Sequence, residues 1–305
     1  MLNANWYKEN GLIMACLAGS HLYGLNRDDS DIDIRGICFS TIESLLGLTG
    51  FEQYQLGKAE SRFYSQEEFG IESEDVTIYS LPKFFKLCLD ANPNIIELLF
   101  VPQNAILFSA PSWEQIIANR ELFLSTKVIH TFAGYAYQQL SKIKNHKRWL
   151  GNAPDKPNPV EYGLSPKLGG GWKWIDKDKY DAYCGRTKEW EAYESWRNNR
   201  NPERAKLEER YGFDSKHALH LYRLFFEGEE LLRTGRITLP LELEIQKKLL
   251  SIFHGEISYD EILSFGEQMK DKLYALEETS PIPKRPNRKE AEILLIKLQR
   301  GKLIE

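Results

Sequence analysis

Two aspartates that alternate with isoleucines constrain this chain more than any other feature of its sequence. Residues 30–36 read Ser-Asp-Ile-Asp-Ile-Arg-Gly, and this period of two is typical of a β-strand. Because residues i and i+2 of a strand lie on one face about 6.6–7 Å apart, Asp31 and Asp33 are predicted to project together, with the isoleucines toward a core. Neighbouring carboxylates repel each other, and a hard divalent cation between them offsets that cost. The pattern therefore predicts a strand that carries a metal site.

A Gly-Ser turn precedes this strand. Gly19 and Ser20 follow an apolar run at 12–17 that we predict to be the first strand. Glycine lets a phosphate approach the backbone, amide groups at the start of a following helix favour an anion, and the Ser20 hydroxyl adds a hydrogen bond. We therefore expect an anion-binding turn beside the acidic strand.

A third carboxylate is needed to complete the metal shell and to accept a proton from an attacking hydroxyl group. Asp75, at the start of a predicted strand over 76–79, is the best-placed candidate. Glu72 and Glu74 remain alternatives, because a different strand register would bring either of them into its place.

Two other interpretations of the acidic residues compete with a metal-binding strand. The series Asp29, Asp31, Asp33 resembles the start of an EF-hand calcium loop, but Ile34 stands where that loop needs glycine and Ser40 where it needs glutamate. A solvated acidic turn explains the acidic residues before the strand but not their alternation with isoleucines after a Gly-Ser turn. The metal-binding strand is thus favoured.

Beyond the strands, helical spacing dominates the sequence. A helix is predicted to start near Ser80 and to stop at Asn92-Pro93-Asn94, with a second helix over 95–100 and a third capped by Ser112. Later helices are predicted over 129–150, 217–232, 241–253, 259–276 and 289–298. The fold class is therefore α+β: a small mixed sheet with flanking helices over 1–125, then a mostly helical domain over 126–305.

Composition excludes several classes of protein. No stretch approaches the roughly 20 apolar residues that span a bilayer, and the first residues carry no basic segment before their short apolar run. The four cysteines lie far apart, which favours buried reduced thiols over a disulfide framework or a zinc knuckle. We expect a cytoplasmic protein with no membrane association. The cysteines are Cys16, Cys38, Cys88 and Cys184.

Charge is distributed unevenly, although the whole chain carries only −4. Residues 142–188 hold eleven basic and five acidic side chains, a net charge of +6, interleaved with three tryptophans and three tyrosines. Within them, a basic and aromatic loop is predicted over about 151–188. Cations and flat rings suit a single-stranded nucleic acid, while a solvated loop with locally packed aromatics explains the composition equally well.

Further basic residues have two interpretations each. Lys216, His220 and Arg223 share one helical face that would bind a triphosphate or a primer backbone, while His217 and His220 also suit a packed helix interior. Arg35 shares the face of the aspartates, where it would form a salt bridge or touch substrate. Lys144, Lys147 and Arg148 form either a nucleic-acid-binding edge or the usual cations of a helix end.

Four motifs together resemble a known superfamily. They are Gly-Ser-His-Leu-Tyr-Gly at 19–24, Ser-Asp-Ile-Asp-Ile-Arg-Gly at 30–36, Asn-Pro-Asn-Ile-Ile-Glu-Leu-Leu at 92–99 and Tyr-Gly-Phe-Asp-Ser-Lys-His-Ala at 211–218. The chain resembles the nucleotidyltransferases related to DNA polymerase beta, and most of its length resembles their bacterial and phage RNA-repair-pathway, or RNA-ligase-associated, subgroup.

This resemblance implies a nucleotidyltransferase that moves a nucleoside monophosphate from an NTP to an acceptor with release of pyrophosphate, using two Mg²⁺ or Mn²⁺ ions. It implies Asp31, Asp33 and Asp75 as catalytic metal ligands. It favours an RNA 3′ end as acceptor and a functional association with an RNA ligase. Nucleotide contacts are expected from Gly19, Ser20, Lys216 and Arg223, and substrate contacts from Arg35, His217, Lys144, Lys147, Arg148 and Trp172.

Two rival functions remain: transfer to a protein hydroxyl group, and nucleic-acid binding without catalysis. The three aspartates argue against a pure binder, because such a protein has no reason to assemble carboxylates that repel each other.

Overall fold

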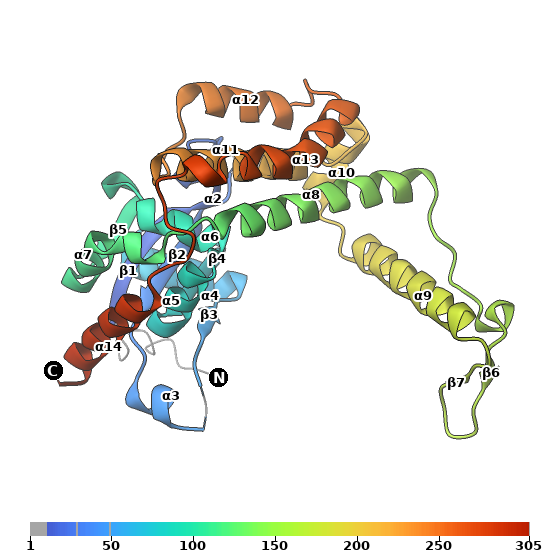
Figure 1. The fold of residues 1–305 in the computed structure, drawn as a ribbon, viewed down its shortest axis with the longest axis horizontal. Coiled ribbons are helices and arrows are strands. Elements are labelled where there is room, and N and C mark those ends of the chain that lie inside the picture. Colours follow the sequence, from blue (N-terminus) through green and yellow to red (C-terminus); the bar gives the residue numbers. More distant parts are fainter. Residues whose placement is uncertain (1–10, 29, 49, 305) are drawn as a thin grey trace.

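The N-terminal third forms a mixed five-stranded sheet with the strand order β3-β4-β2-β1-β5 (Figure 1). The computed structural model describes residues 11–28, 30–48 and 50–304, so Asp29 lies outside the described residues. β2 and β4 run parallel, and the other neighbouring strands are antiparallel. The strands are β1 Leu12–Ala18, β2 Asp33–Cys38, β3 Gln53–Gln55, β4 Asp75–Ser80 and β5 Ile106–Ser109. This arrangement confirms the predicted small mixed sheet.

The alternation in the acidic strand has the predicted effect on burial. Ile34 is buried with Val76 and Ile78 in a small core on one side of the sheet, while Asp33 is only half-buried. β2 begins at Asp33, however, so the exposed Asp31 lies in the segment before the strand and not within it. The predicted strand start is therefore two residues early.

Helices cover both faces of the sheet. Tyr64 of α4 packs into the small core, whereas the helices after β4 pack into the main core on the other face. α5 starts near Ser80 as predicted, and Ser80 is its N-cap, because its side chain accepts a hydrogen bond from the amide of Lys83. The helices of this region are α2 Gly19–Tyr23, α3 Ile42–Leu46, α4 Lys58–Phe69, α5 Leu81–Leu89, α6 Pro93–Ile96 and α7 Pro111–Ala118, with short 3₁₀ helices η1 Glu97–Phe100, η2 Gln103–Ala105 and η3 Arg120–Phe123.

One predicted helix start in this region is wrong. α7 begins at Pro111, with Ala110 as its N-cap, and not after a capping Ser112. Proline at the first helical position has its φ angle already fixed near the helical value and has no amide that needs a partner.

Four of the five predicted later helices form a bundle above the sheet (Figure 1). α11 packs against α8, α12 and α13, and α14 turns back to pack on α5 and η3. These helices are α8 Val128–Gly151, α11 Ser215–Thr234, α12 Leu243–Phe253, α13 Tyr259–Tyr274 and α14 Arg288–Ile304, with 3₁₀ helix η5 Glu277–Thr279 before α14. The main core joins Ile13 of β1 to Leu298 of α14, so buried contacts cross the boundary expected near residue 125. That boundary stays a prediction.

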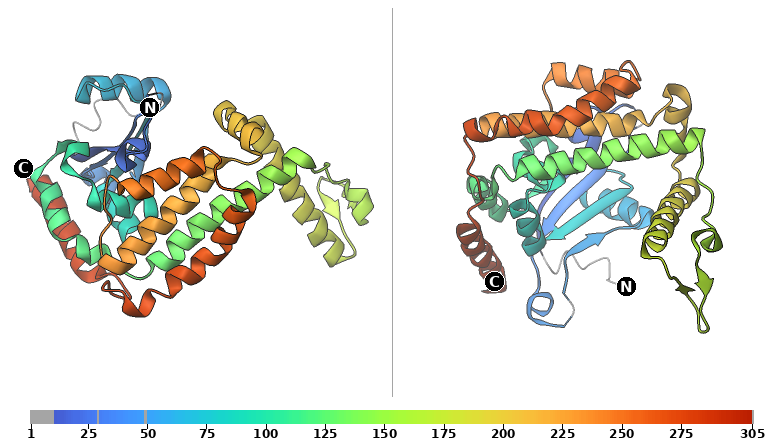
Figure 2. Two further views of the ribbon diagram at one scale, coloured as in Figure 1. Left: turned by 90° about the horizontal axis from the view of Figure 1, so that it is seen from above. Right: turned by 45° about the vertical axis from the view of Figure 1, so that its right-hand side comes forward.

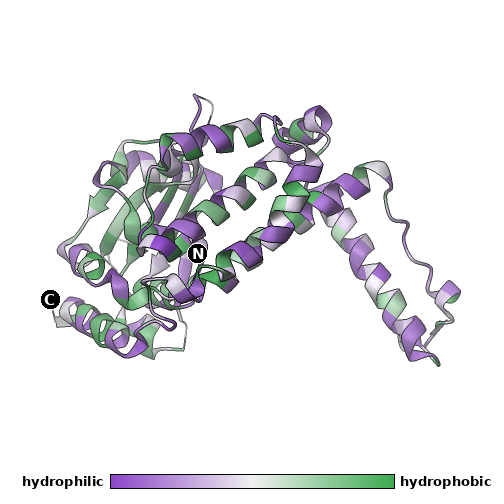
Figure 3. Cartoon of the chain, turned by 45° about the horizontal axis from the view of Figure 1, so that its top comes forward, coloured by the Kyte–Doolittle hydropathy of each residue, from purple (hydrophilic) through white to green (hydrophobic). Residues whose placement is uncertain are grey.

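Residues 152–200, here called the arm, extend away from the bundle (Figures 1 and 2). The predicted loop is correct only as far as residue 176, because Asp176 accepts hydrogen bonds from two amides and starts the helix α9. No residue of α9 is buried, and Figure 3 shows that this helix is mostly hydrophilic. The arm contains η4 Pro159–Tyr162, a hairpin of β6 Ser165–Pro166 and β7 Trp172–Lys173, and α9 Lys177–Asn198; α10 Pro202–Tyr211 leads back to the bundle.

The four cysteines are free thiols, and Cys16, Cys38 and Cys88 are buried as predicted. The predicted burial of Cys184 is wrong: it is only half-buried, because α9 buries none of its residues. Across residues 11–28, 30–48 and 50–304, none of the helices combines the length and the apolar character needed to cross a bilayer.

Candidate active site

Strand pairing brings the Gly-Ser turn and two of the predicted carboxylates into one row. Ala18, which directly precedes Gly19, pairs with Asp33 across β1 and β2. Asp33 in turn pairs with Asp75 across the parallel strands β2 and β4. The turn and both acids therefore lie side by side at one edge of the sheet. Neighbouring members of this row are separated by about one strand spacing, 4.7–4.9 Å.

Gly19 fits closely against Asp33. Its φ angle is +59°, and a Cβ atom at this position would lie 2.1 Å from Oδ2 of Asp33. Only glycine provides both the left-handed backbone and this approach. α2 starts directly at this turn, and its N-cap Ala18 has no polar side chain to accept from the first amides of the helix. These amides suit an anionic ligand.

Asp33 is the electrostatic centre of the row. Burial raises the pKa of Asp33 above its usual range, and the positive charge of Arg35 opposes this rise. The charge of Asp75 raises the pKa further, Lys216 lowers it, and Asp31 raises it. Three carboxylates and two cations thus act on one another at this edge, which is where the sequence predicted a metal site.

Arg35 forms the salt bridge that was one of its two predicted roles. Its guanidinium donates to both carboxylate oxygens of Asp75, with Nη1–Oδ1 and Nη2–Oδ2 distances of 3.1 Å each. Such a bidentate salt bridge fixes the orientation of the carboxylate as well as stabilising its charge. Asp75 therefore stays held in place while its side chain remains 43% exposed.

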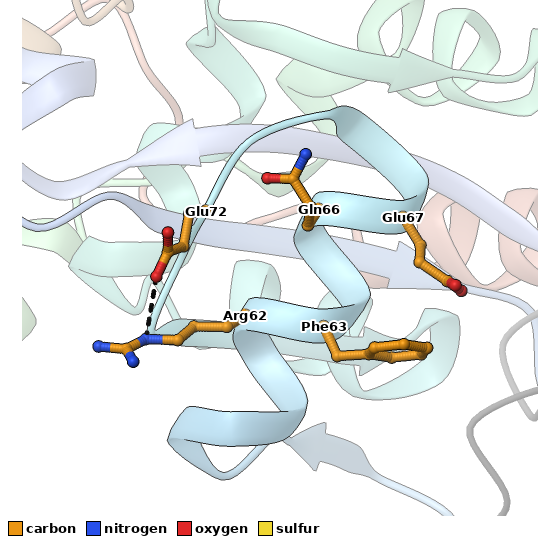
Figure 4. A pocket seen from close by; sticks show the side chains of 5 residues that line it. All are labelled: Arg62, Phe63, Gln66, Glu67 and Glu72. Carbon is orange, nitrogen blue, oxygen red and sulfur yellow. Dashed lines mark ion pairs between the residues drawn. The ribbon is translucent and has the colours of Figure 1, made fainter.

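The alternative third acids, Glu72 and Glu74, face a different element. Glu74 pairs with Lys58 at 2.7 Å and also with Arg62, and Arg62 pairs with Glu72 at 3.2 Å. Figure 4 shows the pair of Arg62 and Glu72 beside a shallow hollow over α4 that Phe63 also lines. Among these three candidates, the structure places only Asp75 in register with Asp33.

Lys216 approaches the carboxylates from the helical bundle. It lies in the first turn of α11, is exposed, and lowers the pKa of Asp33 through its charge. Its ammonium group has no hydrogen bond or ion pair with any residue that the structure describes. Asp214 caps this helix by accepting a 3.1 Å hydrogen bond from the amide of His217. The cap fixes where the helix starts and hence where Lys216 points.

His217 and His220 are not part of an exposed basic face. His217 is only 6% exposed, and its ring nitrogens lie 2.8 Å from Oε1 of Gln139 and 2.9 Å from Nη1 of Arg204. Burial lowers the pKa of His217 to about 3 and that of His220 well below its usual value. The predicted substrate contact of His217 is therefore corrected: the packed interior, the other alternative, is what the structure shows.

The predicted nucleotide contact of Arg223 is also wrong, because this side chain is buried. It is 3% exposed, and its Nη1 lies 2.8 Å from carboxylate oxygens of both Glu97 and Glu227. Beyond its first turn, α11 is enclosed by α8, α12 and α13, so the face shared by positions 216, 220 and 223 passes from solvent into the protein.

A second cluster has ligand atoms spaced as in a metal site, but a cation already lies in it. One ligand atom each of His146, Asp214 and His217 lies within 4.8 Å of the others. Nη1 of Arg204 is 2.8 Å from Oδ2 of Asp214 and close to the ring of His217. Arg200 likewise pairs with Glu208, which accepts from His146. Because the Arg204 guanidinium contacts both Asp214 and His217, it already lies among the ligand atoms where a metal ion would bind, so we assign no metal here. No sequence motif or local spacing predicts that Arg204 or Glu208 belongs to this cluster.

The predicted nucleic-acid contacts on α8 already have partners within the chain. Lys144 pairs with Glu267 at 2.9 Å and Arg148 with Glu189 at 2.6 Å, while the ammonium group of Lys147 lies 3.6 Å from the centre of the Tyr259 ring. Trp172 lies on the hairpin of the arm and is 36% exposed. Figures 1 and 2 show the hairpin well away from the sheet, so the structure does not bring Trp172 to the carboxylates.

Comparison with known proteins gives two individual similarities. An uncharacterised 38.9 kDa protein of Enterobacteria phage T4 is 29% identical over 126 residues, which is 41% of this chain and 36% of the phage protein. A nucleotidyltransferase-like protein from Exiguobacterium sibiricum aligns over 99% of this chain and 76% of its own, with 9% identity and a TM-score of 0.26.

The family comparison extends over most of the chain. Residues 2–264 match the family described as the RNA repair pathway DNA polymerase beta family. The matched range includes the Gly-Ser turn, the three carboxylates and Lys216. The chain therefore belongs to the RNA repair pathway DNA polymerase beta family.

Proposed function

We propose that this protein is a nucleotidyltransferase that moves a nucleoside monophosphate from an NTP to an RNA 3′ end, with pyrophosphate leaving. The observation that carries the proposal is the row in which Asp33 and Asp75 lie on neighbouring strands with Gly19 directly after the end of the third, while Asp31 and Lys216 act on the Asp33 carboxylate. Family membership supports the reaction class, and the RNA-repair description of the family supports an RNA acceptor.

The donor set at this edge suits hard divalent cations. Asp31, Asp33 and Asp75 offer only carboxylate oxygens, which Mg²⁺ and Mn²⁺ prefer, and the charges of Asp31 and Asp75 add to the raised pKa of Asp33. We propose that these three residues hold two such ions. Bound there, the ions would neutralise the triphosphate and polarise its oxygens.

The chain's own groups account for binding and proton transfer. The uncapped amides after Ala18 and the Ser20 hydroxyl bind the phosphates, and Lys216 adds a positive charge from α11. The acceptor oxygen forms a bond to the α-phosphorus as the bond to pyrophosphate breaks. Asp75, which Arg35 holds in place, accepts the hydroxyl proton.

The arm supplies features that suit a single-stranded acceptor. Trp172 and Trp174 are partly exposed at the hairpin, 36% and 43%, beside Lys167 and Lys173. Exposed rings stack on bases, and lysines contact phosphates. Association with an RNA ligase and a cytoplasmic location stay predictions.

Transfer is tested by incubating the purified protein with each labelled NTP, Mg²⁺ or Mn²⁺, and separate RNA, DNA and protein acceptors. Label should move to RNA, and Asp33→Asn should abolish this without lowering the melting temperature in metal-free buffer, because burial and the charges of Asp75 and Asp31 disfavour the ionised Asp33 more than Arg35 and Lys216 favour it. Glu74→Gln is the matched control: it makes the same chemical change at a carboxylate that faces α4, and it should retain activity. Label on protein alone would favour the protein-modifying rival, and an active Asp33→Asn variant would refute the site.

A further inference from the structure

A buried cluster of polar side chains joins two of the four sequence motifs to the helix that carries part of a third. Tyr23 ends the Gly-Ser motif at 19–24, Glu97 belongs to the motif at 92–99, and Arg223 follows the motif at 211–218 on α11. All three are at least 94% buried. None of them touches the row of carboxylates, so the proposed chemistry leaves this cluster without a role.

Glu97 is the centre of the cluster. Its carboxylate accepts hydrogen bonds from the Tyr23 hydroxyl at 2.9 and 3.0 Å and from Nη1 of Arg223 at 2.8 Å. Arg223 also donates to Glu227 at 2.8 Å and to Oδ1 of Asn94 at 3.4 Å. Its guanidinium lies 4.3 Å from the centre of the Tyr23 ring. The tyrosine is thus held at both its hydroxyl and its ring.

The contact matters for α2 because this helix is only five residues long. So short a helix has little stability of its own, and its orientation depends on tertiary contacts. Tyr23 is its last residue and Gly19 its first. Fixing the Tyr23 side chain therefore fixes the direction in which the amides of the Gly-Ser turn point.

α11 connects the same cluster to Lys216. Arg223 follows Lys216 by about two helical turns, a rise of about 10 Å along one rigid element. The helix that offers Lys216 to the carboxylates is thus anchored, through Arg223 and Glu97, to the helix that offers the Gly-Ser turn.

Stability alone does not account for such a cluster. Removing charges from water is costly, and apolar residues of similar volume often stabilise a core as well or better. The Nε atom of Arg223 is buried without a hydrogen-bond partner among the described residues, which adds to this cost. What an ionic cluster provides beyond apolar packing is a defined geometry.

We propose that Tyr23, Glu97 and Arg223 are positioning residues that hold the Gly-Ser turn and Lys216 at a fixed separation, so that both engage the triphosphate of one NTP. This inference rests on the proposed function. The three residues act through the turn and Lys216 and do not contact substrate.

Tyr23→Phe is the sharpest test, since it keeps the ring over Arg223 and removes only the hydroxyl group. We expect the dissociation constant of a fluorescent NTP analogue with Mg²⁺, and the KM for NTP, to rise about ten- to a hundredfold, because the hydrogen bond to the Glu97 carboxylate that orients the turn is lost, and a hydrogen bond to a charged group contributes a free energy of that size. Tyr274→Phe is the matched control: its hydroxyl bonds His130 at 2.8 Å between α13 and α8, and its loss should leave both values unchanged.

A double-mutant cycle with Lys216→Ala separates positioning from a general loss of structure. If the cluster acts by placing Lys216, Tyr23→Phe should weaken NTP binding less in the Lys216→Ala background than in the wild type. Binding is measured at a temperature at which all variants are folded, as shown by circular dichroism. Wild-type affinity in Tyr23→Phe, or strict additivity in the cycle, would overturn the positioning role alone. A wild-type protein that binds no NTP would overturn the proposed function as well.

Discussion

At Gly19, two requirements meet in one residue. The left-handed backbone disfavours any side chain, and the carboxylate of Asp33 occupies the place where a Cβ atom would lie. The left-handed backbone is shared with other turns of the chain, whereas the close contact with a carboxylate is specific to the acidic row. Substitutions at two glycines can therefore separate backbone strain from damage to the site.

We predict that Gly19→Ala abolishes nucleotidyl transfer and that Gly163→Ala does not. Gly163 has a φ of +71°, and a Cβ atom there would meet nothing within 4 Å of the described residues. Both variants incur the left-handed penalty of about 1–2 kcal/mol, but only Gly19→Ala must displace Asp33. Initial transfer rates and thermal melts of the two variants check this. Comparable activity in both would mean that the contact with Asp33 is not needed.

At the scale of elements, the arm differs from the rest of the molecule. α9 buries no residue, and pairs three residues apart along the helix, such as Arg186 with Glu189 and Arg197 with Glu194, support it locally. The ammonium groups of Lys167, Lys173 and Lys177 form no ion pair with another described residue. They are therefore available to phosphates, in contrast to the paired cations of α8.

We predict that replacing these three lysines by alanine flattens the salt dependence of RNA affinity by about 2 units, since each neutralised phosphate of a single strand contributes about 0.7. The variant with Lys144, Lys147 and Arg148 replaced by alanine loses the same charge, but those side chains have partners at Glu267, Tyr259 and Glu189, so its slope should change less. Fluorescence anisotropy at several salt concentrations measures both slopes. A larger change in the α8 variant would place the RNA on α8.

At the scale of the whole molecule, α8, α10 and α11 meet around His217. Gln139 and His146 face it from α8, Arg204 from α10 and Asp214 from the cap of α11. Burial lowers the pKa of this imidazole from its ordinary value of 6.5 to about 3, so the ring stays neutral in the folded protein down to about pH 3. Folding must therefore exclude a proton that the unfolded chain binds in acid.

We predict that His217 makes the free energy of unfolding fall as pH decreases from 6.5 toward 3, by at most about 1.4 kcal/mol per pH unit. The unfolded state binds more protons in this window, so stability rises with pH and the contribution is complete above pH 6.5. His217→Asn should show a shallower slope in urea titrations between pH 7 and 5. His254→Asn, at an exposed position, controls for the loss of a histidine. Parallel slopes for wild type and His217→Asn would contradict the prediction.

The sequence by itself determined the parts of this protein that depend on neighbouring residues. The alternation around Asp33, the helix start near Ser80 and the helical spacing that gives α8 and α11 are local, and all three appear in the structure. The short strands β3 and β5 have only three and four residues, which is too little pattern to predict.

Tertiary structure alone decided which distant residues meet. The parallel register of β2 and β4 sets Asp75, and not Glu74, beside Asp33, and no local rule fixes a pairing between residues 42 positions apart. Because α8, α12 and α13 pack around α11, Arg223 is a buried partner of Glu97 and not the nucleotide contact that the sequence predicted. A helical period shows which residues share a face, but only the surrounding elements decide whether that face meets solvent, because burial depends on contacts far apart in the chain.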